Sequence, residues 1–225
     1  MWNIDLTLVD VARVSRDAYA EAFQRTTGRR LVALPQLAGA TDSEIFFESL
    51  AINEVVSEAN DQLAHYHAEL AAAFGSRAGL LAERGRLLPG ALESLAAVSR
   101  LPGAIQTVLT GTIKPNAVHK LRAFGLDRYL DTEIGGFGSD VYPKGTQILR
   151  SLAKSEEKYG IKLTSGDVVY VGDSTRDVAA AKVAAVRCVG VATGRSTAAE
   201  LKEAGAYPVL DDLSVTTRVV AAVSP

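Results

Sequence analysis

Short apolar runs alternate with helical patterns along much of the chain, and this alternation restricts the possible folds more than any other feature. After Pro89-Gly90, apolar segments at 104–109, 168–171 and 188–191 are each followed by a segment of helical character. Parallel strands need long crossover connections, which are usually helices that cover the two faces of the sheet. We therefore predict an α/β fold with a Rossmann-like parallel sheet as its core.

The individual elements follow from apolar periodicity and from the residues that start and stop helices. We expect an N-terminal strand in the first ten residues, further strands at 104–109, 133–134, 168–171 and 188–191, and an edge strand at 208–210. Helices are expected at 92–98, 115–125, 144–159, after 173 up to 184, from 197 and at 215–223. Thr197 and Glu200 have the spacing of a capping box for the helix that follows them.

A block of purely helical patterns interrupts this alternation. Ser15 can cap a first helix that stops at Gly28, and residues 41–44 have the spacing of a capping box for a second. An apolar stripe with steps of three and four, from Val56 to Ala73, predicts the longest helix, ending near Gly75. We therefore predict an α/β core domain at 1–12 and 89–225 and an inserted all-helical cap domain at 13–88.

Composition and charge narrow the possible partners. The chain has 24 Lys and Arg against 26 Asp and Glu, a formal charge of −2, so nothing indicates binding to nucleic acid or to an acidic membrane. No apolar run reaches the length of a membrane span, and no basic leader precedes the first strand, so we expect a cytoplasmic protein.

Cys188 is the only cysteine and is expected to be a buried, inert thiol. His65 and His67 lie two residues apart, which is the wrong spacing for metal ligands on a helix.

Polar side chains gather where the predicted strands end. Asn3 and Asp5 point to the same side of the first strand, Thr110 follows the strand at 104–109, and Asp173 follows the strand at 168–171. In addition, Lys144 starts a helix and Asp177 lies one helical turn beyond Asp173. Ligands of open α/β sheets bind beyond the carboxyl ends of the strands, so we expect all of these residues on one rim.

These residue types suit a cation and an oxyanion. The carboxylates of Asp5, Asp173 and Asp177 are oxygen ligands of the kind that Mg²⁺ takes together with water and phosphate oxygens. Thr110, the Gly111 amide and Lys144 supply hydrogen-bond donors and one positive charge for an anion. The sequence therefore predicts a metal and phosphate site.

Four segments also carry a family resemblance. WNIDLT, VLTGT, YPKG and VVYVGDSTRD, in this order, resemble the four signature motifs of the haloacid dehalogenase (HAD) superfamily. The likeness is strongest to phosphoglycolate phosphatase-like members with a helical, C1-type cap, and it covers nearly the whole chain. It implies a Mg²⁺-dependent hydrolase that acts on the phosphate ester of a small metabolite.

The resemblance also implies a role for each motif residue. Asn3 stands where the family has its Asp nucleophile, and Asp5 is the acid that protonates the leaving group and then activates water. Thr110 and Lys144 bind the phosphate, with Gly111 beside them. Mg²⁺ is held by Asn3, Asp5 and Asp173, and Asp177 supports this shell. The segment 39–42 resembles the substrate-facing loop of the cap, so Thr41 and Asp42 are candidates for substrate binding, although the capping box explains them equally well.

Two residues depart from the family pattern. Leu6 stands where glycine is common, which the intact neighbouring residues make tolerable. Asn3 matters more, because a neutral carboxamide is a poor nucleophile and cannot form an aspartyl phosphate. Its carbonyl oxygen can still ligate Mg²⁺, with one negative charge fewer to hold the metal.

Two hypotheses from different classes follow. In the first, the chain is a capped Mg²⁺-dependent phosphatase whose turnover is impaired by Asn3. In the second, it is a catalytically silent relative that binds a phosphorylated ligand or a protein partner. A metal-free 2-haloacid dehalogenase is disfavoured by Asp5, while phosphomutase activity, the identity of the substrate and the oligomeric state stay open.

Overall fold

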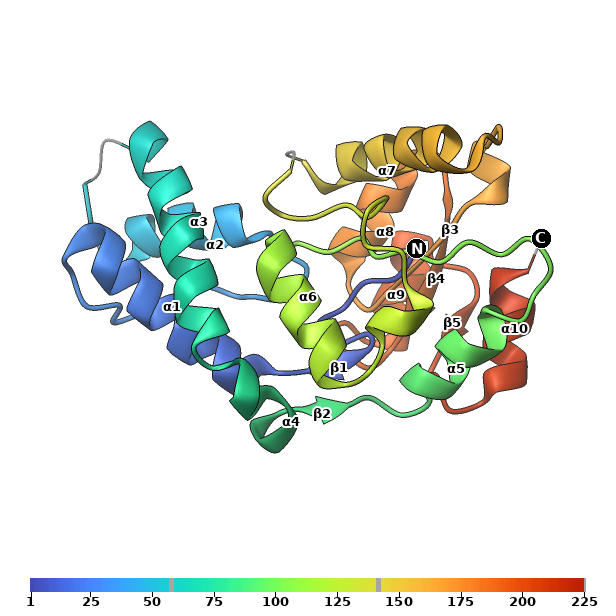
Figure 1. The fold of residues 1–225 in the computed structure, drawn as a ribbon, viewed down its shortest axis with the longest axis horizontal. Helices are drawn as coiled ribbons and strands as arrows, with labels where there is room; N and C mark the ends of the chain where they lie inside the picture. The colour runs from blue at the N-terminus through green and yellow to red at the C-terminus, as the bar shows by residue number, and fades with distance from the viewer. Residues whose placement is uncertain (57–58, 141–142, 225) are drawn as a thin grey trace.

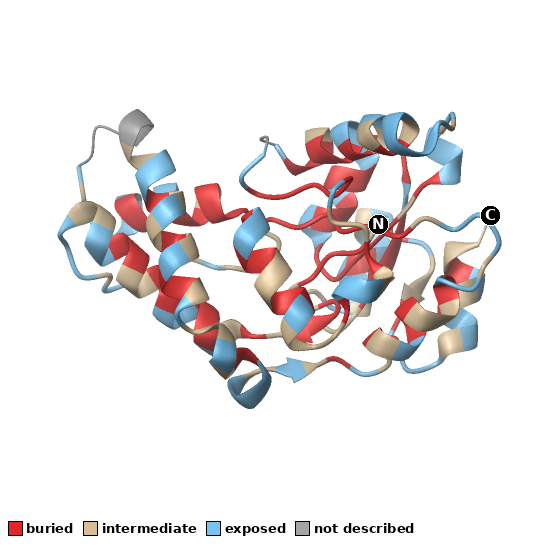
Figure 2. Cartoon of the chain, in the orientation of Figure 1, coloured by how far each residue is buried: buried red, intermediate tan, exposed pale blue. Residues whose placement is uncertain are grey.

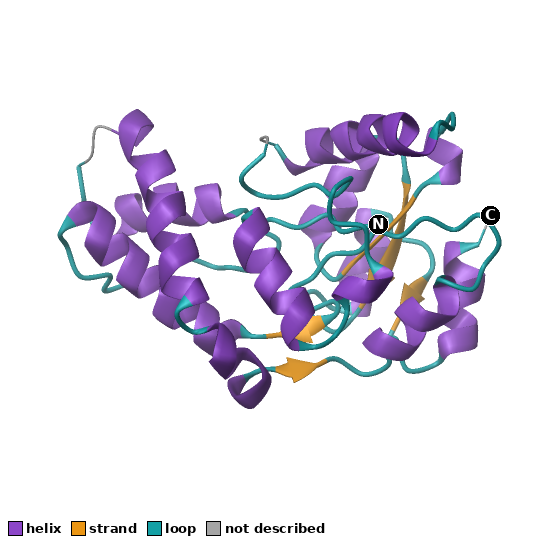
Figure 3. Cartoon of the chain, viewed as in Figure 1, coloured by secondary structure: helices purple, strands orange, loops and turns teal. Residues whose placement is uncertain are grey.

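The core of the molecule is a parallel sheet in which three strands run side by side. A computed structural model describes residues 1–56, 59–140 and 143–224. Within it, β3 (Val169–Gly172), β4 (Arg187–Val191) and β5 (Val209–Leu210) pair in that order and in parallel. Single parallel bridges extend this sheet from Trp2 to both Val108 and Val171, and from Leu109 to Gly136. The first residues of the chain therefore lie in the middle of the sheet, beside β3 (Figure 3).

The two faces of the sheet follow from the two-residue period of its strands. Tyr170 and Cys188 pack in one apolar cluster with α7 (Lys144–Tyr159), α8 (Thr175–Val183) and α9 (Ala198–Ala204). Val171 and Val189 face the other way and pack with α5 (Ala91–Val98), α6 (Lys114–Ala123) and α10 (Thr216–Val223). Helices thus cover both faces, and the strands between them are largely buried (Figure 2).

A block of helices lies to one side of this sheet (Figure 1). It contains α1 (Ala12–Thr27), α2 (Asp42–Ile52), α3 (Ala59–Gly75), the 3-10 turn Ala78–Leu80 and α4 (Leu81–Arg84). The chain enters and leaves the block through two short strands, β1 (Val9–Asp10) and β2 (Arg86–Leu87), which pair antiparallel. Two further 3-10 turns, Asp127–Tyr129 and Ser165–Asp167, lie in the core.

Most of the expected elements are confirmed. α7 has the predicted bounds, with Gly160 as a left-handed C-cap, and Gly28 ends α1 in the same way. The capping boxes at 41–44 and 197–200 both form, and β5 lies at the edge of the sheet. The α/β class and the parallel core are as predicted. Among the described residues, no helix combines the length and the apolar character that crossing a membrane requires.

Three local predictions are wrong. Ser15 does not cap the first helix; it is buried within α1, which begins at Ala12, where the Asp10 carboxylate accepts the Ala12 N–H at 3.2 Å. No strand forms at 133–134, because the Ile134 carbonyl accepts the Ser151 hydroxyl of α7 at 2.5 Å, and the bridge lies at Gly136 instead.

The third wrong prediction is at Val56, which is fully exposed and precedes α3 instead of belonging to its apolar stripe. In the segment 104–109 only Val108 and Leu109 form bridges. Tyr142 of the third motif lies outside the described residues.

Candidate active site

Asn3 lies at the centre of the rim where the middle strands end. It directly follows Trp2 in the sheet, and its side chain is buried. The amide nitrogen Nδ2 donates to the Asp173 Oδ1 atom at 2.8 Å, to the Asp5 backbone carbonyl at 2.9 Å and to the Thr7 hydroxyl at 3.3 Å. Three oxygen atoms from two separate segments therefore surround this nitrogen.

Asp173 and Asp177 are joined through the turn that ends β3. The backbone amides of Asp173 and Ser174 and the Ser174 hydroxyl all donate to the Asp177 Oδ2 atom, at 2.7 to 3.2 Å. The Asp173 Oδ1 atom accepts from Thr7 as well as from Asn3, both at 2.8 Å. Burial, together with the neighbouring charge of Asp177, raises the pKa of Asp173 to about 7.

Lys144, at the start of α7, is paired with Asp177. Its ammonium group lies 2.6 Å from the Asp177 Oδ1 atom, which also accepts the Tyr170 hydroxyl at 2.7 Å. Burial by itself raises the pKa of Asp177, but the charge and hydrogen bond of Lys144 outweigh it and lower that pKa below its usual value. Asp177 is therefore ionised and holds the Lys144 ammonium group in place, while its other oxygen atom accepts the Asp173 N–H.

Lys120 is a buried cation of the site that sequence reasoning missed. Its ammonium group lies 2.8 and 2.7 Å from the two carboxylate oxygens of Asp5 and 2.9 Å from the Thr112 hydroxyl. Thr112 also donates to Asp5, at 2.9 Å. The ring of Phe74, from α3, lies under the same ammonium at 5.5 Å. Lys120 therefore fixes the Asp5 carboxylate at the junction of the core and the helical block.

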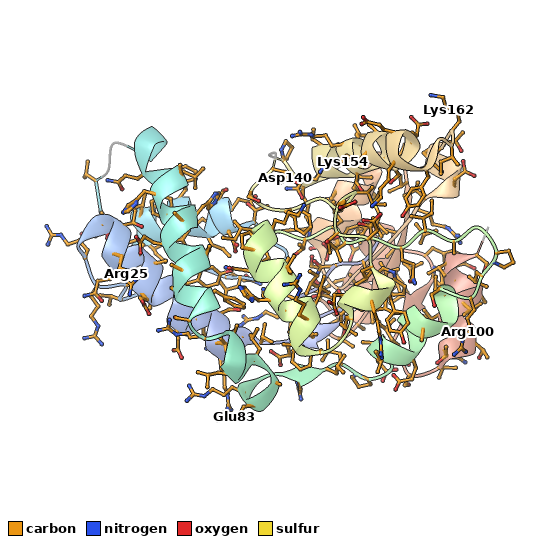
Figure 4. All side chains as sticks on the ribbon, viewed as in Figure 1. Arg25, Glu83, Arg100, Asp140, Lys154 and Lys162 are labelled. Atoms are coloured by element: carbon orange, nitrogen blue, oxygen red, sulfur yellow. The ribbon has the colours of Figure 1, made fainter. Side chains whose placement is uncertain are left out.

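These two lysines differ from the other cations of the chain. Figure 4 shows Arg25, Arg100 and Lys162 at the periphery of the molecule. Among the described lysines and arginines, Lys120 and Lys144 are the buried ones. A buried cation is costly unless it is paired, and each of the two has an aspartate within 3 Å.

A cavity of about 70 Å³ opens at this rim. Its walls include the predicted residues Asn3, Asp5, Thr110, Gly111, Lys144 and Asp42. Lys120 and Thr112 complete the core side, and the helical block contributes Tyr19, Ile45 and the loop 37–40. The structure therefore brings motif residues from four distant segments together, with Asp173 and Asp177 bonded directly to the side chains of Asn3 and Lys144.

The loop before α2 connects the helical block to the core. The Asp42 carboxylate accepts the Tyr19 hydroxyl at 2.6 Å and the Ile113 N–H at 2.8 Å, and the Asp42 N–H donates to the Gly111 carbonyl at 2.8 Å. Burial raises the pKa of Asp42 above its usual value. Thr41 accepts the Glu44 N–H in the capping box and does not line the cavity. Asp42 both lines the cavity and locks the loop onto the core.

Gly111 permits this contact between loop and core. A Cβ atom at Gly111 would lie 2.1 Å from the Ala40 carbonyl oxygen, which is well inside van der Waals distance. Only a residue without a side chain lets the loop approach the end of the strand so closely. His67, by contrast, is half-buried against the Ser43 hydroxyl at 3.2 Å, and His65 is exposed, so both have the packed or solvated roles expected.

The oxygen atoms of the rim are of the kind that Mg²⁺ takes, but their arrangement does not fit the ion. The Asp173 carboxylate accepts a hydrogen bond from the amide nitrogen of Asn3, and the Asp5 carboxylate accepts hydrogen bonds from the Lys120 ammonium group. Asp177 is bonded to Lys144. Within the part of the chain that the structure describes, no group of three His, Cys, Asp or Glu residues is arranged to hold a metal ion. The rim is therefore satisfied by its own hydrogen bonds.

A parallel α/β sheet with helices on both faces, and with a carboxylate and lysine rim at its strand ends, defines a Rossmann-like α/β protein whose ligands bind at the carboxyl ends of the strands. The family model for haloacid dehalogenase-like hydrolases matches residues 1–182. The chain belongs to this family.

Several solved structures share the fold of this chain. A hydrolase from Pseudomonas syringae is 20% identical, with a TM-score of 0.72 over 100% of this chain and 98% of that one. A predicted phosphoglycolate phosphatase from Haemophilus somnus 129PT is 19% identical, with a TM-score of 0.65 over 97% and 95%. An aspartate-to-asparagine mutant of CbbY from Rhodobacter sphaeroides, in complex with xylulose-(1,5)bisphosphate, is 22% identical, with a TM-score of 0.68 over 95% and 93%. No curated protein matches this chain.

Proposed function

We propose that the cavity binds the phosphate group of a small phosphorylated metabolite and that the chain is a phosphatase whose turnover is impaired by Asn3. The observation that carries this proposal is the meeting of Asn3, Thr110 and Lys144 at one cavity. The Gly111 amide and the Thr110 hydroxyl are donors for phosphate oxygens, and Lys144 is a cation that lines the same cavity.

The chemistry that this site lacks depends on residue 3. With a carboxylate there, an oxygen atom attacks phosphorus, the bond from phosphorus to the leaving oxygen breaks, and Asp5 delivers a proton to that oxygen. Water then attacks the aspartyl phosphate, gives its proton to Asp5 and releases phosphate. The carboxamide of Asn3 has no negative charge for the first attack, so this chain binds the ester and hydrolyses it poorly.

Magnesium belongs to the aspartate form of this site in our proposal. The family resemblance implies Mg²⁺ with Asn3, Asp5 and Asp173 as ligands and Asp177 in support, but the hydrogen-bonded arrangement of these residues does not fit the ion. We therefore derive no step through a metal in the present chain. When bound to an aspartate form, the ion supplies positive charge that stabilises the phosphoryl group in transfer.

Residues 13–88 are proposed to act as a cap over the core at 1–12 and 89–225. Support comes from the β1 and β2 pair, which joins the two parts, and from the block's contribution of Tyr19 and Ile45 to the cavity. Asp42 is a candidate for substrate selection because it lines the cavity, and Thr41 precedes it in the same loop. The CbbY mutant holds a sugar bisphosphate, so phosphorylated sugars and phosphoglycolate are the first compounds to test.

A second candidate function is supported by the bonding of Asn3. A neutral residue with donors to two oxygen ligands stabilises a site that binds a phosphorylated ligand without turning it over. The two candidates differ in one respect, which is whether restoring the carboxylate restores hydrolysis.

The activity of Asn3→Asp decides between them. We expect the Asn3→Asp protein to hydrolyse p-nitrophenyl phosphate in the presence of Mg²⁺, at least about a thousandfold faster than the unaltered chain, since loss of a nucleophile costs several orders of magnitude. Steady-state release of p-nitrophenol measures this, with the Asn3→Asp, Asp5→Asn double variant as the control that lacks the acid. An inactive Asn3→Asp protein that still binds phosphate would contradict the phosphatase and leave the silent binder.

A further inference from the structure

The amide nitrogen of Asn3 is surrounded by the kinds of atoms that otherwise bind a hard cation. The Asp173 carboxylate, the Asp5 backbone carbonyl and the Thr7 hydroxyl converge on Nδ2 at 2.8, 2.9 and 3.3 Å. Carboxylate, carbonyl and hydroxyl oxygens are the usual ligands of divalent cations such as Mg²⁺ and Ca²⁺. Here an N–H donor group occupies the centre of the set.

The orientation of the amide is dictated by its neighbours. The Asp5 carbonyl can only accept a hydrogen bond, and it lies 2.9 Å from the Asn3 side chain. Rotating the amide by half a turn would place the Asn3 carbonyl oxygen against this acceptor and against Asp173, with no proton between them. The donor group therefore has to face Asp5 and Asp173 as long as nothing else lies between them.

The carboxylates of Asp5 and Asp177 are already paired with lysines. Both oxygens of Asp5 contact Lys120, and one of them also accepts the Thr112 hydroxyl. Asp177 accepts from Lys144, Tyr170 and Ser174. A cation entering the site would have to break the bonds of Asn3 to Asp173 and Asp5 and draw the ligands in to about 2.1 Å. In return, the cation would be attracted by the negative charge of a single carboxylate, that of Asp173.

We infer that the carboxamide of Asn3 replaces a divalent cation at the centre of this site, so that the chain folds and binds phosphate without a metal. Two hydrogen bonds from one neutral group do the structural work of the ion, holding the loop at Asp5 against the end of β3 at Asp173. Phosphate then meets Lys144 and the donors at Thr110 and Gly111 with no metal in between.

The same geometry makes an aspartate at residue 3 dependent on a cation. Its carboxylate would face the Asp173 oxygen and the Asp5 carbonyl oxygen at the distances that Nδ2 now has, about 2.8 to 2.9 Å, with no donor to separate them. Three acceptors at such distances repel each other strongly in a buried site. The dependence on a cation is therefore set by a single side chain, and metal binding and stability report it without a measurement of catalysis.

The test is calorimetric titration of MgCl₂, and separately MnCl₂, into the unaltered protein and into Asn3→Asp. We expect no binding to the unaltered protein at millimolar metal. We expect Asn3→Asp to bind the metal at least about 100-fold more tightly than the detection limit for the unaltered protein. Thermal unfolding is expected to be unchanged by EDTA or Mg²⁺ in the unaltered protein. Without metal, Asn3→Asp should melt lower and recover with Mg²⁺, because a ligand that binds only the folded state raises its stability.

Two further variants separate the amide from the charge. Asn3→Ala has the charge of the unaltered site but no N–H donors, so it is expected to melt lower than the unaltered protein and to be partly restored by Mg²⁺. Asp173→Asn in the Asn3→Asp background is expected to abolish the gained metal binding. Equal responses to Mg²⁺ from the unaltered protein and Asn3→Ala would show that the amide does not replace the ion.

A phosphate titration completes the experiment. Inorganic phosphate is expected to bind the unaltered protein with the same affinity in EDTA and in Mg²⁺. Phosphate binding that requires Mg²⁺, or Mg²⁺ binding to the unaltered protein as tight as to Asn3→Asp, would overturn the inference. If phosphate does not bind under either condition, the proposed function fails, and the metal titrations still decide the role of Asn3.

Discussion

Gly194 packs against the carboxylate of Asp173 at the rim. A Cβ atom at Gly194 would lie 1.9 Å from the Asp173 Oδ2 atom, so any side chain has to displace the carboxylate. Because the Oδ1 atom of the same group holds Asn3 and Thr7, the displacement would break both hydrogen bonds. The absence of a side chain at Gly194 therefore allows the Asp173 carboxylate to occupy its position.

We predict that Gly194→Ala lowers the free energy of unfolding by about 1–3 kcal/mol, the cost of leaving buried polar groups without partners or of forcing an overpacked site. Urea denaturation followed by circular dichroism measures the change. Gly79→Ala is the matched control, since a Cβ atom there meets no atom within 4 Å. Equal effects from the two substitutions would show that Asp173 is free to move.

Individual site residues could be predicted where they follow strands. Asn3, Thr110 and Asp173 all come directly after apolar runs, which marks them as rim residues without any structure. Lys120 could not be predicted in this way, because its role depends on where α6 packs. Its one signal is position: it shares the buried face of α6 with Ala117 and Leu121, and a lysine there needs a buried partner.

At the scale of elements, the start of α2 is held by a side-chain hydroxyl from α1 and by a backbone N–H at the residue before α6. Tyr19 of α1 and the start of α6 at Ile113 both donate to Asp42. The capping box that begins α2 was predictable because it depends on residues three apart. The bonds to Tyr19 and Ile113 were not, because they span 23 and 71 residues of chain. The strand expected at 133–134 failed for the same reason, since distant Ser151 of α7 takes its carbonyl.

We predict that Tyr19→Phe lowers the free energy of unfolding at neutral pH by about 1–3 kcal/mol, because the buried Asp42 carboxylate loses a donor. Chemical denaturation of the variant measures it, with Tyr207→Phe, at an exposed position, as the control. The pKa of Asp42 is already raised by burial, and loss of the donor raises it further.

The sign of the pH dependence follows. When the pKa of a carboxyl group is raised by folding, the folded state loses stability as the pH rises and the group ionises. The loss of stability in Tyr19→Phe is therefore largest above the folded-state pKa of Asp42. It disappears as the pH falls through that pKa towards the pKa of the unfolded state. A deficit that is constant with pH would show that the hydroxyl does not support an ionised Asp42.

At the scale of the whole molecule, four segments meet because a parallel sheet places the carboxyl ends of its strands on one edge. The strand order from Gly136 through Val108, Trp2, β3 and β4 to β5 puts the Asn3 segment beside β3, so Asn3 and Asp173 come into hydrogen-bond contact. This convergence was predictable from the alternation of strands and helices. The orientation of the Asn3 amide was not, since a sequence does not show which atoms face each other across a sheet edge.

The most direct test of this account locates a metal. Crystals of the unaltered protein and of Asn3→Asp, both grown with MnCl₂ and phosphate, are compared in anomalous difference maps measured above the manganese absorption edge. We predict a manganese peak between residue 3 and Asp173 in Asn3→Asp and none there in the unaltered protein, where phosphate lies against Lys144 and Thr110. A manganese ion of equal occupancy bound to the Asn3 side chain of the unaltered protein would contradict the account.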